Sequence, residues 1–275
     1  MKVWYASDLH VESKTNRTAT LALRDLAIKE APDVLILGGD VCNGPHALSG
    51  VLAMFSGIAP LNVFVPGNHE LWDGAIDART IHYKVLPEIC SAHGFDMLID
   101  EPLQIGSIGI VASMGWYDGT FAPPNVFSAD ALARKQHLGR VLLDASQLRW
   151  LAADGSPMSD ADVTNLLLDD LRSQIENLGD EVTRVVAALH MVPHANALGQ
   201  RWNEEERSYF RAFQGSERFG ELLGRDSRIR DILCGHDHES SQSKIGTITV
   251  HKRPVGHIKP GSVFEPTAHR VLLDL

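Results

Sequence analysis

Five short polar motifs in this chain each follow, within a few residues, an apolar run with the length and composition of a β-strand. In an open α/β sheet the carboxyl ends of parallel strands meet at one edge, and the loops there carry ligand-binding residues. Five such loops are therefore expected to converge on one place. The motifs, in chain order, are Asp8-Leu9-His10, Gly39-Asp40, Gly67-Asn68-His69-Glu70, Leu189-His190-Met191 and Gly235-His236-Asp237-His238.

Each motif taken alone has a simpler explanation. Asp8 and Asn68 are good helix caps, and glycines beside Asp40 and His236 are typical of turns. For any single motif, the capping explanation and the ligand explanation are about equally good. The occurrence of all five at successive strand ends strongly favours a shared site.

The elements between the motifs alternate, which is typical of a layered α/β domain. Short β-branched runs predict strands at residues 2–6, 34–38, 61–66, 185–189 and 229–234, with a hairpin over 104–112 that turns at Gly106 and Ser107. Apolar residues at helical spacing predict helices at residues 16–30, 45–58, 72–94, 130–138, 146–153 and 159–178.

Composition limits the classes of protein that the chain can belong to. A length of 275 residues suits one large α/β domain, and a net charge of −10 argues against broad nucleic-acid binding. Neither a secretory signal nor an apolar run long enough to span a bilayer is visible, so we expect a cytoplasmic protein without a membrane partner. The three cysteines, Cys42, Cys90 and Cys234, lack metal-type spacing and are expected to be reduced.

The residue types in the motifs suit metal chemistry. Carboxylates, imidazoles and an amide oxygen are ligands for borderline divalent ions such as manganese, iron or zinc, whereas no thiolate cluster is present. A lone aspartate can bridge two ions through its two oxygens. Two ions about 3.5–4 Å apart can hold a bridging hydroxide and stabilise charge on the attacking and leaving oxygens of a phosphoryl group.

The ordered motif set, from Asp8 to His238, resembles that of the calcineurin-like metallophosphoesterase superfamily. The resemblance covers most of the chain and implies a single domain over residues 1–275 with a four-layer α-β-β-α sandwich fold. The segments 116–179 and 201–225 are interpreted as helical insertions, the first of them a lid that selects the substrate's alcohol portion.

The resemblance also implies a role for each motif residue. Two divalent ions are implied, with Asp40 as their bridging ligand and His69 as the general acid that protonates the leaving oxygen. Asn43 and His194 are further candidates on the substrate side. The other implied ligands are Asp8, His10 and His238 for the first ion, and Asn68, His190 and His236 for the second.

The reaction implied is hydrolysis of a phosphate ester by a metal-bridging hydroxide. We expect a small phosphomonoester or phosphodiester substrate, such as a nucleotide, and no stable nucleic-acid partner. A phosphoprotein phosphatase is the main alternative, since residues 67–70 match that branch, but the Asp-Arg-Gly sequence expected after the bridging aspartate is absent. A non-enzymatic scaffold with the same fold is a second alternative, and the oligomeric state is left open.

Two departures from the superfamily pattern lie inside the motifs. Many members have an aspartate three residues after the bridging one, where this chain has Asn43, and an amide stabilises an imidazolium less than a carboxylate does. Met191 takes the place of a frequent second histidine. Outside the motifs, packing is the favoured role for Trp116, Tyr117 and Phe121, surface positions are favoured for His251 and His257, and Arg201, Trp202 and Arg207 are candidate phosphate or base contacts.

Overall fold

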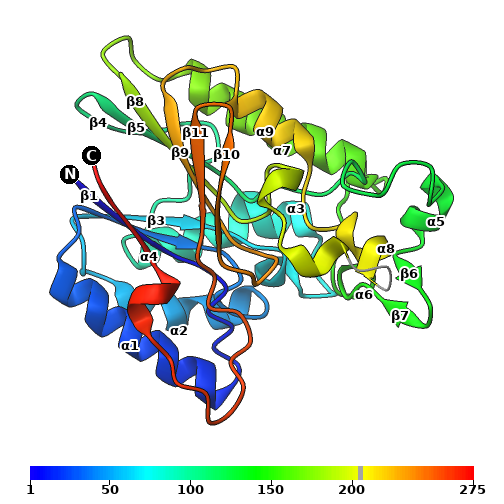
Figure 1. Ribbon diagram of the computed structural model, residues 1–275, viewed down its shortest axis with the longest axis horizontal. Coiled ribbons are helices and arrows are strands. Elements are labelled where there is room, and N and C mark those ends of the chain that lie inside the picture. The colour runs from blue at the N-terminus through cyan, green and yellow to red at the C-terminus, as the bar shows by residue number, and fades with distance from the viewer. Residues whose placement is uncertain (204–206) are drawn as a thin grey trace.

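The computed structural model describes residues 1–203 and 207–275, and two β-sheets lie face to face at its centre (Figure 1). The first sheet has the strand order β12-β1-β2-β3. Strands β1, β2 and β3 run parallel and β12 pairs antiparallel with β1. Their bounds are Lys2–Ala6 for β1, Val34–Gly38 for β2, Leu61–Val65 for β3 and Val271–Asp274 for β12.

The second sheet has the order β10-β11-β9-β8-β5-β4. Its four inner strands are parallel, and the outer strands β10 and β4 pair antiparallel with their neighbours. The bounds are Leu103–Ile105 for β4, Ile108–Ser113 for β5, Arg184–Leu189 for β8, Ile229–Cys234 for β9, Ser241–Ile245 for β10 and Ile248–Lys252 for β11.

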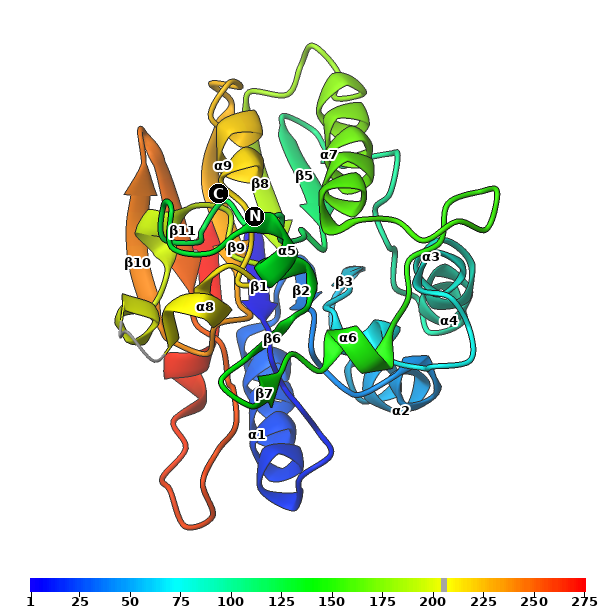
Figure 2. The same ribbon diagram turned by 90° about the vertical axis from the view of Figure 1, so that its right-hand side faces the viewer.

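Helices cover the outer face of each sheet, as Figures 1 and 2 show. Helices α1 (Lys14–Glu30), α2 (Pro45–Phe55) and α4 (Leu86–Ala92) lie against the first sheet, whereas α7 (Asp160–Glu176) and α9 (Glu217–Leu223) lie against the second. The predicted four-layer α-β-β-α sandwich is therefore confirmed. Among the described residues, no helix is long and apolar enough to cross a membrane.

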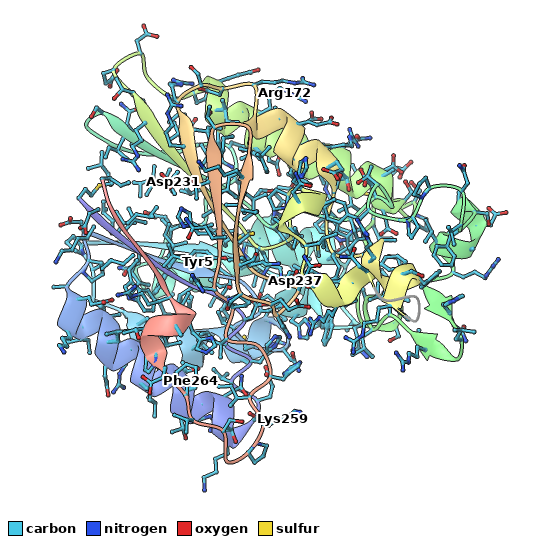
Figure 3. The ribbon with its side chains drawn as sticks, in the orientation of Figure 1. Tyr5, Arg172, Asp231, Asp237, Lys259 and Phe264 are labelled. Atoms are coloured by element: carbon cyan, nitrogen blue, oxygen red, sulfur yellow. The ribbon has the colours of Figure 1, made fainter. Side chains whose placement is uncertain are left out.

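Alternating side chains of the first strand reach both faces of their sheet. Val3 and Tyr5 point into the core between the sheets, and Trp4 and Ala6 point toward the helices. Tyr5, labelled in Figure 3, donates a hydrogen bond from its hydroxyl to the Leu189 carbonyl, 3.1 Å away, and so links β1 to β8 across the interface. Strands that are apolar on both faces are typical of parallel sheets covered on both sides.

Side-chain caps explain where the two longest helices begin. The Ser13 side chain accepts a hydrogen bond from the Asn16 amide at the start of α1, and α1 ends at Ala31 in the left-handed conformation. Ser159 and Asp162 form a reciprocal capping box at the start of α7. These caps satisfy backbone N–H groups that have no partner within the helix.

The segment between the two halves of the core extends from one end of the sandwich, at the right of Figure 1. It contains α5 (Ala129–Ala133), β6 (Gln136–His137), β7 (Arg140–Val141) and α6 (Asp144–Gln147). These elements lie beside α8 (Ser208–Arg211), and the Tyr209 hydroxyl donates to the Ala131 carbonyl at 2.7 Å. The lid role of 116–179 stays a prediction. One part of this segment, α7, packs on β5 and belongs to an outer helical layer.

Several predicted elements differ from those observed. Of the predicted helix at residues 146–153, only residues 146 and 147 are helical, because α6 ends at Gln147 and Leu151 then bridges Pro157 around the Asp154-Gly155 turn. Within 72–94 the helical part is residues 78–92, in α3 (Ala78–Thr80), η2 (Ile81–Val85) and α4, so the predicted helix begins later than expected. Strands β10, β11 and β12 were not predicted.

The second predicted insertion, 201–225, is only partly helical in the described residues. It contains the end of η4 (Gln200–Asn203), then α8 and α9, while residues 204–206 lie outside the described part of the chain. The predicted packing role of the aromatic residues after β5 is confirmed, since all three are buried: Trp116, Tyr117 and Phe121.

Removing the buried His82 should make the protein less sensitive to acid. Burial lowers the pKa of His82 to about 3, so between pH 3 and its unfolded value of 6.5 the unfolded chain binds more protons. The contribution of the neutral His82 ring to the free energy of unfolding is therefore fully present above pH 6.5 and is lost as the pH falls toward 3. Urea unfolding of chelator-treated protein measures the effect. Between pH 7 and pH 5, the free energy of unfolding should fall by about 2 kcal/mol less in His82→Phe than in the wild type. His46→Gln, at an exposed histidine, is the control, and an unchanged pH dependence in His82→Phe would contradict the assignment.

Candidate metal centre

The five motifs meet where the carboxyl ends of β1, β2 and β3 approach those of β8 and β9. Backbone hydrogen bonds join their loops: the Asp8 amide donates to Gly39, the His10 amide to Asp40, and the Gly235 amide to His190, at 2.9, 3.0 and 2.9 Å. The His236 amide donates to the Asp8 carboxylate at 3.0 Å. This last bond crosses from one sheet to the other, so the site is built from both.

The loops hold candidate ligands in a backbone conformation that non-glycine residues rarely adopt. Among the described residues, nine non-glycine residues have positive φ, and five of these are candidate ligands. Such strained conformations concentrate at functional sites, where the surrounding structure imposes them. The φ angles are 58° for Asp8, 44° for His10, 50° for Asp40, 70° for His236 and 57° for His238.

The glycines in the motifs let the loops approach the carboxylates closely. A Cβ atom at Gly67 would overlap the Asp40 carboxylate, and a Cβ atom at Gly235 would overlap that of Asp8. Neither glycine has a positive φ, so close approach and not backbone freedom requires it.

Among the described residues, three groups of side chains have the geometry of metal sites: two of them share Asp40, and the third consists of His10, His238 and His257. In each group the possible ligand atoms all lie within 4.8 Å of one another. A carboxylate common to two groups can bridge two ions through its two oxygens. Of the two that share Asp40, the first group is Asp8, His10, Asp40 and His238, and the second is Asp40, His190 and His236.

Hydrogen bonds select which nitrogen of each second-group histidine faces the centre. The Nδ1–H of His190 donates to the Gly38 carbonyl at 2.9 Å, and the Nε2–H of His236 donates to the Phe213 carbonyl at 3.2 Å. Nε2 of His190 and Nδ1 of His236 then face each other at 3.1 Å. Backbone carbonyls commonly fix the orientation of metal-binding imidazoles in this way.

The other candidate ligands fit the same interpretation. Nε2 of His10 lies 3.0 Å from Nε2 of His238, which in turn lies 3.3 Å from the Asp8 carboxylate. The Oδ1 atom of Asn68 is buried and has no hydrogen-bond partner. A buried oxygen without a hydrogen-bond partner is available to bind a cation. Together with the imidazoles and carboxylates of the motifs, it makes a set of ligands that suits a divalent cation.

Both carboxylates at the centre are ionised. Burial opposes the charge on Asp8, but the hydrogen bond and charge of His238 outweigh it and lower the Asp8 pKa to about 2. Burial likewise opposes the charge on Asp40, whose pKa is nevertheless held well below its usual range, chiefly by the charge of His190. Two buried negative charges at one point favour cation binding.

The imidazoles divide between two protonation states. Burial lowers the pKa of His10 to about 3, so this ring is neutral and offers a lone pair. Burial also opposes a charge on His190, but the Asp40 carboxylate outweighs it and raises the pKa to about 10. Burial and the neighbouring His190 lower the pKa of His236 to about 4. The His190–His236 pair therefore holds one positive charge against Asp40, at the place where an ion would bind.

His69 lies at the rim of the centre. Its Nδ1–H donates to Oδ1 of Asn43 at 2.7 Å, and its Nε2 lies 3.7 Å from the Asp40 carboxylate. Trp72 stacks on the imidazole with ring centroids 3.6 Å apart and an angle of 29° between the rings. The amide of Asn43 thus occupies the position of the aspartate found in many superfamily members, and it leaves Nε2 facing the centre.

Glu70 holds backbone and does not contact the His69 ring. Its two carboxylate oxygens accept from four buried amides, at distances from 2.7 to 3.0 Å. Burial, reinforced by the charge of Asp40, raises the Glu70 pKa to about 7. The four amides belong to Asp40, Val41, Cys42 and Gly67, so this side chain joins the second motif to the third.

Some residues outside the ligand set differ in position from expectation. His194 is not brought to the centre, because its ring accepts from the Asn196 amide and lies 3.3 Å from the Glu217 carboxylate, beside a different cavity. His257 is exposed on a loop, as predicted, but its ring lies 4.5 Å from that of His10. Amides of the two residues before His257 donate to Ser7 and Asp8, a pairing that no sequence motif announces.

Glu70→Gln should destabilise the fold although it replaces none of the candidate ligands. The glutamine NH₂ group would face two backbone amides, which would then have no hydrogen-bond acceptor. Each buried amide left without an acceptor costs about 1–3 kcal/mol, so the free energy of unfolding should fall by about 2–6 kcal/mol. Chemical denaturation at pH 8, where the carboxylate is ionised, measures the change. Glu88→Gln, on the exposed side of α4, is the matched control. Equal stability of the two variants would contradict the role assigned to Glu70.

Comparison with known proteins identifies the family. The family described as calcineurin-like phosphoesterase matches residues 1–240. No curated protein matches the sequence.

Solved structures share the fold. Phosphopantetheinyl hydrolase from Mycobacterium tuberculosis has 21% sequence identity and a TM-score of 0.70, with 93% of this chain and 89% of that chain covered. A dimetal phosphatase from Danio rerio has 12% identity and a TM-score of 0.51, with coverage of 92% and 86%. Together with the match over residues 1–240, the fold places this chain in the calcineurin-like phosphoesterase family, whose members are metal-dependent hydrolases.

Proposed function

We propose that this protein hydrolyses a small phosphate ester at a centre of two divalent ions, with His69 as the general acid. The observation that carries the proposal is the shared position of Asp40, which belongs to both ligand groups while its carboxylate lies 3.7 Å from Nε2 of His69. Asp8, His10 and His238 complete the ligands of the first ion. The second ion takes Asn68, His190 and His236.

Each part of the site has a distinct role in this reaction. Two bound divalent ions supply a hydroxide nucleophile near neutral pH and offset the charge of the phosphate group. Asn43 accepts from Nδ1–H of His69, so Nε2 is the nitrogen that gives a proton to the leaving oxygen. Trp72 limits rotation of the imidazole by stacking on it. Manganese, iron and zinc all suit these ligands.

A cavity of about 690 Å³ adjoins the centre and suits the organic part of a small substrate. Apolar and aromatic side chains line it, among them Trp202, Phe210 and Phe213, and three arginines contribute to its wall: Arg140, Arg201 and Arg207. A concave apolar pocket favours a small phosphomonoester or phosphodiester over a phosphoprotein segment.

The phosphopantetheinyl hydrolase from Mycobacterium tuberculosis shares the fold, so phosphopantetheinyl compounds belong among the substrates to be tested. A panel assayed with manganese should contain these, simple mono- and diesters, nucleotides, cyclic nucleotides and phosphopeptides. Preference for phosphopeptides would favour the phosphoprotein phosphatase alternative. The scaffold alternative is disfavoured, since the implied ligands and His69 are all present.

Asp40→Asn should lower metal loading and abolish hydrolysis. An amide has one oxygen and no charge, so it cannot bridge two ions as a carboxylate does. Elemental analysis of the purified protein should give about two divalent ions per chain for the wild type and fewer for the variant, and chelation should abolish wild-type hydrolysis. Full activity in Asp40→Asn would exclude Asp40 as the bridge.

His69→Ala should retain metal but react slowly. Loss of a general acid typically lowers the rate about 10²–10⁴-fold, so kcat should fall by this factor while the metal content stays at the wild-type level. The loss should be smaller for substrates whose leaving alcohol is more acidic, because these need less protonation. A uniform loss across leaving groups would indicate that His69 does not act as the acid.

A further inference from the structure

Asp144 is a buried carboxylate beside the metal centre that no sequence motif identifies. It begins the short helix α6 in the segment between the core halves, and 2% of its surface is exposed. Oδ1 accepts from Nδ2 of Asn68 at 2.9 Å and from Nε1 of Trp72 at 2.7 Å. Oδ2 accepts from the Tyr117 hydroxyl at 3.0 Å.

Among the described residues, the side chains that donate to Asp144 are all neutral. A buried carboxylate without a cationic partner is costly to fold, and apolar residues of similar volume usually pack in such places at lower cost. Asp144 also lines the cavity next to the centre. Its position and its partners point to a role in the site beyond packing.

The bond to Asn68 determines which end of that amide faces the metal centre. Because Nδ2 donates to Asp144, Oδ1 is the atom of the Asn68 amide that has no hydrogen-bond partner among the described residues. If the amide turned over, Oδ1 would face a carboxylate and Nδ2 would face the cation site. The negative charge on Asp144 also polarises the amide and makes Oδ1 a better ligand, as carboxylates do for metal-bound imidazoles.

The bond to Trp72 extends the same control to His69. The indole Nε1–H is held by Asp144, and the ring system stacks on the His69 imidazole at a centroid distance of 3.6 Å. One carboxylate oxygen thus contacts both the side chain of a candidate ligand and the aromatic ring that covers the candidate acid.

We propose that Asp144 is a positioning residue, which orients Asn68 toward the second ion and, through Trp72, the ring of His69. This inference rests on the proposed function for the existence of the metal site. It makes the segment 116–179 part of the metal centre, because α6 supplies the carboxylate.

Manganese titration of chelator-treated protein tests the proposal through binding and not through activity. Asp144→Asn keeps the side-chain volume but removes the charge and presents an NH₂ group to at least one donor. Manganese affinity at one of the two sites should fall about 10–100-fold, the range typical for lost partners of metal ligands. Asp130→Asn, at an exposed residue of α5 in the same segment, should bind like the wild type. Wild-type affinity in a folded Asp144→Asn protein would overturn the proposal.

Trp72→Phe separates the two effects of Asp144. It keeps the bond between Asp144 and Asn68, so manganese affinity should stay at the wild-type value, while kcat should fall because the ring over His69 is no longer held. Equal weakening of manganese binding in Trp72→Phe and Asp144→Asn would indicate general loosening of the site and would overturn the specific role.

A crystal structure of the wild-type protein with manganese tests the geometry even if Asp144→Asn does not fold. Oδ1 of Asn68 should be directly bound to an ion, while Nδ2 keeps its bond to Asp144. Direct binding of Asp144 to the ion, or loss of its bond to Asn68, would overturn the proposal. Failure of the wild type to bind any manganese would instead contradict the proposed function.

Discussion

The structure depends on keeping two ionised carboxylates, Asp8 and Asp40, buried where the two sheets meet. Their charges would repel each other and oppose folding if nothing offset them. Imidazoles from β8 and β9, backbone amides and strained loop conformations all converge on these two groups. The negative charges of these two carboxylates lower the stability of the metal-free protein, and they also attract divalent cations. The cost in stability and the affinity for metal therefore have the same electrostatic origin.

Other buried carboxylates near the centre are stabilised in three different ways. Glu70 accepts from four backbone amides, and Asp144 accepts from three neutral side chains. Asp237, inside the last motif, pairs with the fully buried Lys252 of β11 and accepts from the Gly199 amide. Each arrangement ties a loop to an element far away in sequence. The loops are thereby fixed with the precision that a multi-ligand centre needs.

Much of the fold follows from local patterns, and the particular elements show why. Strands β1, β2 and β9 coincide with their predicted bounds, because a short apolar run between polar motifs has few other uses in a layered domain. The helix expected over 146–153 fails because a short amphipathic window cannot outweigh a turn and a tertiary bridge. Strands β10, β11 and β12 were not predicted, because strands with alternating or mixed exposure carry weaker signals than fully buried apolar runs.

The sequence by itself indicated the family through its five ordered motifs, and it predicted that they would converge, because parallel strands bring their carboxyl ends to one edge. It could not determine which nitrogen of His190 or His236 faces the centre, since the carbonyls of Gly38 and Phe213 decide this and lie far from those residues in the chain. Nor could it reveal His257 beside His10, or Asp144 behind Asn68. His257 and Asp144 lie in segments whose sequence has no periodic pattern. Only the tertiary structure shows that these residues contact the motifs.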